Sequence, residues 1–74
     1  MTTVATVRPA ERMALRLAAA DVPVRDVVSQ LAAFDHDSLA AARDALVQRL
    51  LRHGDDRTAA FALQAVYQAI AART

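Results

Sequence analysis

The strongest constraint on this chain is its scarcity of residues that break helices. Its 74 residues include one glycine, Gly54, and two prolines, Pro9 and Pro23, whereas alanine makes up about a quarter of the sequence. Alanine has the highest helix propensity of all residues, and glycine and proline have the lowest. We therefore expect helices along nearly the whole chain, interrupted only near the prolines and the glycine.

Proline residues mark the beginnings of the first two predicted helices. Pro9 suits the first helical position because its missing N–H is not needed there, and this helix should run to about Ala20. Pro23 begins the second helix after a break at Asp21-Val22. Apolar residues recur at helical spacing in both segments and predict the buried faces. These residues are Ala10, Met13, Ala14, Leu17 and Ala20 in the first helix, and Val24, Val27, Val28, Leu31 and Phe34 in the second.

Capping residues mark the other two helices. The run Asp35-His36-Asp37-Ser38 is rich in N-cap residues and opens the third helix, and Gly54 after Arg52 and His53 is its stop signal. Asp55 or Asp56 should cap a fourth helix that continues to the C-terminus. The predicted apolar faces are Leu39, Ala42, Leu46, Val47, Leu50 and Leu51 in the third helix, and Ala59, Ala62, Leu63, Val66, Tyr67 and Ile70 in the fourth.

These segments predict an all-α fold, a compact bundle of four helices in one domain over residues 9–74. The first three helices could form a helix-turn-helix-like trihelical unit. Residues 1–8, MTTVATVR, are predicted to be an extended or disordered N-terminal arm. A domain of this size buries only about 60% of its unfolded surface, and without cysteine it has no disulfide. Oligomerisation or docking on a partner is the remaining way to add to the stability of such a small core.

Charge and hydropathy narrow the function classes. The net charge is +1, with nine arginines against eight acidic residues, so the chain lacks the basic surplus typical of nucleic-acid binders. It has no apolar run of about 20 residues and no secretory signal, which predicts a cytoplasmic protein without a membrane partner. The absence of Lys and Asn, with abundant Ala and Arg, indicates the gene of a high-GC bacterium.

The segment Val22–Ala42 resembles the core of a helix-turn-helix. It has a small residue midway in its first helix, Ala in place of the usual turn glycine, then an apolar residue, an N-cap and apolar contacts from the second helix. The residues at these positions are Ser29, Ala33, Phe34, Asp35, Leu39 and Ala42. The resemblance implies a DNA-binding transcriptional regulator whose second helix reads base edges.

The residues expected on the exposed side of that second helix argue against DNA binding. They are Asp37, Ala40, Ala41, Asp44 and Ala45. Two carboxylates would repel DNA, and alanine reads little beyond a thymine methyl group. Helix-turn-helix DNA binding is therefore the alternative function rather than the preferred one. Its candidate phosphate contacts are Arg8, Arg12 and Arg16, which cluster on one side of the first helix.

The tripeptide Asp37-Ser38-Leu39 resembles the Asp-Ser-Leu of acyl and peptidyl carrier proteins. In that family the serine carries a phosphopantetheine arm, so the resemblance implies Ser38 as an attachment site. Two positions depart from the family pattern, because His36 replaces the usual glycine and Asp44 replaces an apolar residue. A serine in the first turn of a helix is the simpler interpretation.

No other group of residues predicts chemistry. Two clusters of His and Asp, residues 35–37 and 53–56, bracket the third helix and should lie roughly 25 Å apart, too far for one metal site. We identify no nucleophile–base arrangement and no phosphate-binding glycine loop. The sequence therefore predicts no enzyme activity, no metal and no cofactor.

These observations together predict a small non-enzymatic helical interaction or regulatory module that forms a homodimer or docks on a partner protein. Phe61 interrupts an otherwise polar and alanine-lined side of the fourth helix and is the centre of the predicted contact. The predicted partner contacts are Phe61, Ala65, Arg57, Gln64, Gln68 and Leu15. The alternative is that the fourth helix lies centrally and Phe61 packs inside its own chain.

Overall fold

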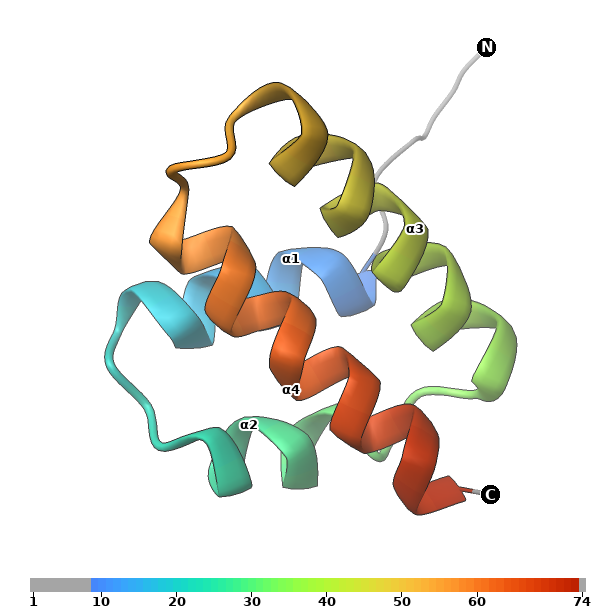
Figure 1. Ribbon diagram of the computed structural model, residues 1–74. Coiled ribbons are helices and arrows are strands. Elements are labelled where there is room, and N and C mark those ends of the chain that lie inside the picture. Colours follow the sequence, from blue (N-terminus) through green and yellow to red (C-terminus); the bar gives the residue numbers. More distant parts are fainter. Residues whose placement is uncertain (1–8, 74) are drawn as a thin grey trace, which may run out of the picture.

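Residues 9–73 fold into four helices (Figure 1). The computed structural model describes residues 9–73, and in that range the helices are α1 (Pro9–Ala19), α2 (Val24–Leu31), α3 (His36–Arg52) and α4 (Arg57–Arg73). The predicted all-α bundle of four helices is confirmed, with each helix within a few residues of its predicted bounds. The predicted N-terminal arm, residues 1–8, lies outside the described residues.

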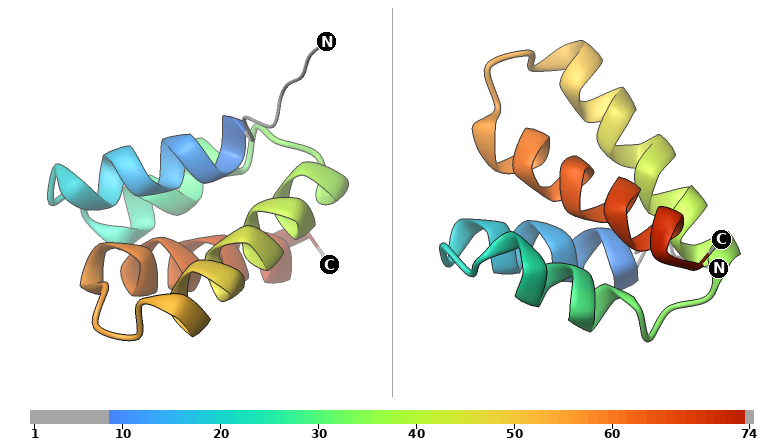
Figure 2. Two further views of the ribbon diagram at one scale, coloured as in Figure 1. Left: turned by 90° about the horizontal axis from the view of Figure 1, so that it is seen from above. Right: turned by 60° about the horizontal axis from the view of Figure 1, so that its bottom comes forward.

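The helices form two layers, which both views of Figure 2 show one above the other. The shorter helices α1 and α2 form one layer, and the antiparallel hairpin of α3 and α4 forms the other. Helices α1 and α4 each pack against all three other helices, and α4 packs on them most extensively, so it is the central element of the bundle. The described residues have a radius of gyration of 11.6 Å.

The core between these layers is built largely from alanine. Twelve apolar residues are fully buried within residues 9–73, and seven of them are alanines: Ala10, Ala14, Ala42, Ala59, Ala62, Ala65 and Ala69. The larger ones are Leu31, Leu39, Leu46, Val27 and Val66. Alanine side chains let helix backbones approach closely, but each removes little apolar surface from water. Stability in this bundle therefore depends on close helix contact more than on bulky side chains.

The buried face of α4 differs from the predicted one. The prediction placed Tyr67 on the core face and Ala65 opposite it, but Ala65 is fully buried and Tyr67 is 50% exposed. The reason is that α1, α2 and α3 all pack on α4, so the small residues that allow close approach turn inward. Two other predicted core positions, Ala20 and Leu51, are also exposed.

Helix α1 ends in a Schellman motif. Asp21 has a φ of 59°, the one positive φ in residues 9–73. The Asp21 N–H donates to the Ala18 carbonyl at 3.2 Å, and the Val22 N–H donates to the Leu17 carbonyl at 3.1 Å. This is the hydrogen-bond pattern of a Schellman end, in which glycine usually holds the left-handed position. Here an aspartate holds it, and the chain turns toward α2.

Aspartate side chains cap the N-termini of both hairpin helices, α3 and α4. Asp35 caps α3 by accepting a hydrogen bond from the Ser38 N–H at 2.8 Å, and Asp56 caps α4 by accepting one from the Ala59 N–H at 3.0 Å. Of the two predicted caps for the fourth helix, Asp56 is therefore the one used. Helix α3 ends at its predicted place, but His53 makes the turn with φ −133°, and Gly54 has no positive φ.

Candidate interaction surface

Phe61, the predicted centre of the partner contact, packs largely within its own chain. It is half-buried against the core and lines a shallow depression of about 320 Å³ beside Val22, Pro23 and Val24 of the α1–α2 connection. Ala65 is fully buried and offers no side-chain surface to a partner. The central position of α4 thus matches the alternative stated for Phe61, that it contacts its own chain.

Helix α4 exposes a different stripe to solvent. Its exposed residues at helical spacing are Ala60, Gln64, Tyr67, Gln68 and Ala71. We call these five residues the α4 outer face. They recur at intervals of four, three, one and three residues, which places them on one side of a helix. Gln64 and Gln68 belong to the predicted partner contact, whereas Ala60, Tyr67 and Ala71 were not part of it.

The α4 outer face carries no charge. All residues from Thr58 to Ala72 are uncharged, and the arginines Arg57 and Arg73 stand at the two ends of the helix. Exposed helix faces usually carry charged residues, whereas the centres of protein interfaces are depleted in charge and enriched in tyrosine. The stripe therefore shares two features with an interface centre, the lack of charge and an exposed tyrosine.

Leu15, the remaining predicted contact, lies on a second surface at the opposite layer. It is partly buried and lines a depression of about 540 Å³ between α1 and the turn after α2. Among residues 9–73, its lining is Pro9, Arg12, Met13, Leu15, Arg16 and Phe34. Both arginines are exposed, and neither forms an ion pair or a hydrogen bond within residues 9–73. Arg8, the third predicted nucleic-acid contact, lies outside the described residues.

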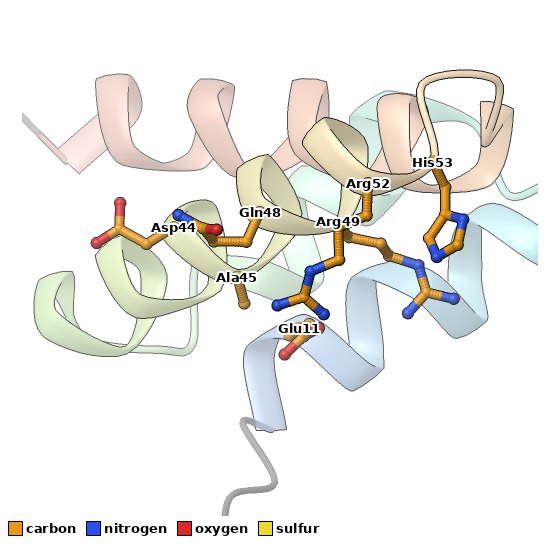
Figure 3. Close-up of a pocket in the computed structure, with 7 residues that line it drawn as sticks. All are labelled: Glu11, Asp44, Ala45, Gln48, Arg49, Arg52 and His53. Atoms are coloured by element: carbon orange, nitrogen blue, oxygen red, sulfur yellow. The ribbon is translucent and has the colours of Figure 1, made fainter.

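A third depression lies between α1 and α3 and has balanced charge. It measures about 460 Å³ and is lined by Glu11, Asp44, Ala45, Gln48, Arg49, Arg52 and His53. Figure 3 shows Glu11 of α1 facing the arginine side chains of α3 across this cleft. Two carboxylates offset two guanidinium groups, and Arg49 is further paired with Asp56. The cleft therefore has no charge surplus with which to attract an ion of either sign.

The two resemblances noted in the sequence fall on the α2–α3 segment. On α3, Asp37 and Asp44 are exposed, whereas Ala40, Ala41 and Ala45 are partly buried. Asp44 is paired with Arg43 at 3.1 Å, so the surface that a helix-turn-helix protein would turn toward DNA offers Asp37 and this ion pair. Ser38 lies in the first turn of α3, where its backbone N–H donates to the capping carboxylate of Asp35.

The two capping aspartates have perturbed acidity. Hydrogen bonds from the Ser38 side chain and backbone lower the pKa of Asp35 below its ordinary value. The pKa of Asp56 is also lowered, first by the Ala59 N–H and then by the Arg49 guanidinium, whose Nε lies 3.0 Å from Asp56 Oδ2. Asp56 thus joins α3 to the start of α4. Both aspartates are explained by helix capping and suggest no reaction.

No helix in residues 9–73 is both long and apolar enough to cross a membrane. The same residues bring together no cluster of three or more His, Cys, Asp or Glu side chains that could hold a metal ion. No protein-family model, curated protein or solved structure matches this chain.

Proposed function

We propose that this chain is a small non-enzymatic interaction module that forms a homodimer through the α4 outer face. The single observation that carries the proposal is the exposed, uncharged stripe of five residues on the central helix. Interfaces of this composition lose little charge solvation when water is removed. The small alanine core also favours dimerisation, because a second copy of the chain would bury additional apolar surface.

The chemistry of the stripe favours a second copy as the partner. In a two-fold interface each residue patch meets itself, so a charge near the axis would face its own image. Glutamine carries both donors and acceptors, and a tyrosine hydroxyl also donates and accepts. Gln64, Tyr67 and Gln68 can therefore bond to a copy of themselves. A stripe built for a charged partner would instead carry the opposite charge.

The spacing of the stripe also suits an antiparallel pairing of two α4 helices. With the two-fold axis between Gln64 and Tyr67, Ala60 would face Ala71 of the partner subunit, and Gln64 would face Tyr67 of the partner subunit. Small residues at both ends permit close approach of the two helices. Arg57 would then lie at the C-terminal end of the opposite helix, where the helix dipole favours a cation.

Sedimentation equilibrium over nanomolar to millimolar concentration tests this proposal. We expect a dimer mass at high concentration and a weakened dimer for Gln64→Glu, which adds a carboxylate of the same shape next to its own image. Gln30→Glu, on the exposed side of α2, adds the same charge elsewhere and is the matched control. A wild-type monomer at every concentration, or equal effects of the two substitutions, contradicts the proposal.

A further inference from the structure

We propose that the depression around Leu15 and Phe34 binds an acidic amphipathic helix of a partner protein. This site lies on α1 and on the turn after α2, in the layer opposite the α3–α4 hairpin. It is separate from the α4 outer face, so the proposal does not depend on dimerisation.

Charge complementarity identifies the partner as acidic. Within residues 9–73, Arg12 and Arg16 are the only charged residues that line the depression, and neither has an ion-pair partner in that range. Two unpaired guanidinium groups on one rim attract carboxylates, which they can bind through two parallel hydrogen bonds.

The spacing of the arginines indicates a helical partner. Arg12 and Arg16 are four residues apart on α1, so they follow each other along one side of the helix about 6 Å apart. Two carboxylates one turn apart on a facing helix have the same spacing. A partner helix with acidic residues at positions i and i+4 would engage both arginines at once.

The floor of the depression distinguishes a protein partner from a nucleic acid. Met13, Leu15 and Phe34 are partly buried apolar residues that line the same depression as the two arginines. A phosphate backbone has no apolar side chains to bury against these residues, whereas an amphipathic helix places apolar side chains beside its carboxylates. Binding should therefore require both the acidic and the apolar residues of the partner.

A fluorescence-polarisation titration of the full chain tests this inference. The probe is a fluorescein-labelled helical peptide of about 15 residues, with a leucine stripe and glutamates one turn apart beside it. We expect micromolar binding at low salt. A peptide with glutamine for every glutamate, and one with glutamine for every leucine, should each bind about tenfold more weakly, a difference of about 1.4 kcal/mol.

Variants of the chain assign the binding to this surface. The double substitution Arg12→Gln and Arg16→Gln should weaken binding of the acidic peptide about tenfold. The matched control, Arg25→Gln with Arg52→Gln, removes the same charge from α2 and from the end of α3 and should change binding less than about twofold. Circular dichroism confirms that both double variants fold.

Three results would overturn the inference. The first is the absence of peptide binding up to about 100 µM. The second is an equal loss of affinity in the two double variants, which would show that only net charge matters. The third is equal or tighter binding of a duplex DNA of similar length, lost in the Arg12 and Arg16 variant, which would identify the arginines as phosphate contacts.

Discussion

Asp21 occupies a backbone conformation that suits glycine better. Its φ of 59° lies in the left-handed region, which disfavours residues with a Cβ atom. Asp21→Gly should therefore raise the free energy of unfolding by about 1 kcal/mol. Urea unfolding followed by circular dichroism measures this change. Asp55→Gly, at a position without positive φ, is the control and should give no gain.

Gly54 presents the opposite case, because its backbone makes no use of glycine. It has no positive φ, and a Cβ atom built there would lie 3.7 Å from the Leu50 carbonyl oxygen, an ordinary contact. Gly54→Ala should raise the free energy of unfolding by about 0.4–1 kcal/mol, since alanine restricts the unfolded chain. A loss of stability in the same urea experiment would mean that the α3–α4 connection needs glycine after all.

The capping aspartates should make the stability of the fold depend on pH in the acidic range. The pKa values of Asp35 and Asp56 are lowered in the folded state, so both residues release their protons more readily there than in the unfolded chain. Their contribution to stability is fully present above their ordinary pKa of 3.8 and is lost as the pH falls through the lower folded values. We expect the urea midpoint to fall steadily below about pH 4.

Asparagine substitutions separate this effect from general acid unfolding. Asparagine is also a good N-cap but does not titrate, so Asp35→Asn with Asp56→Asn should flatten the pH dependence below about pH 4. Asp55→Asn leaves both caps intact and should keep the wild-type profile. If the urea midpoints of the wild type and the double variant depended equally on pH, the caps would be ruled out as the origin of that dependence.

At the scale of the helix, α4 should tolerate large residues on one side only. Ala62 is fully buried where α4 contacts its neighbours, so Ala62→Leu should lower the free energy of unfolding by about 1–3 kcal/mol through overpacking. Ala72 is exposed on the same helix, and Ala72→Leu should change stability by less than about 0.5 kcal/mol. Matched urea titrations compare the two. Similar small effects would mean that the alanine face is loosely packed.

The helices were predictable from the sequence because their ends carry local signals. Pro23, Asp35 and Asp56 act through neighbouring backbone groups, so residues close in sequence determine where helices begin. The ending of α1 at Asp21 was predicted only as a break, since an aspartate in a left-handed conformation depends on the path of the following chain. The buried side of α4 could not be predicted from neighbouring residues, because it is determined by the three helices that pack on α4.

The candidate surface was predicted in part for the same reason. Gln64 and Gln68 were correctly placed on an exposed side, but Phe61 was taken as its centre because its ring stood out among polar residues. The spacing of Ala59, Ala62 and Ala65 was the available signal, since small residues three apart indicate close helix contact. That signal would have turned Ala65 inward and left Tyr67 outside, as the structure has them.

At the scale of the whole molecule, two aromatic residues of α4 should affect different equilibria. Tyr67→Ala should weaken the proposed dimer by about 2 kcal/mol, roughly thirtyfold, and leave unfolding of the monomer almost unchanged. Phe61→Ala should lower the free energy of unfolding by about 2 kcal/mol, because Phe61 packs against the core. Sedimentation equilibrium and dilute-solution urea unfolding measure the two quantities. If instead Phe61→Ala weakened the dimer and Tyr67→Ala lowered the stability of the monomer, Phe61 would lie at the interface.

The central position of α4 has a consequence for how the chain folds during synthesis. Helices α1, α2 and α3 leave the ribosome before α4, yet all three pack against it. Until Arg57–Arg73 has emerged, the apolar faces of the earlier helices have no complete core to join, and short isolated helices are marginal in water. The fold should therefore form in one late step, after translation of its last described helix, with no stable intermediate on the ribosome.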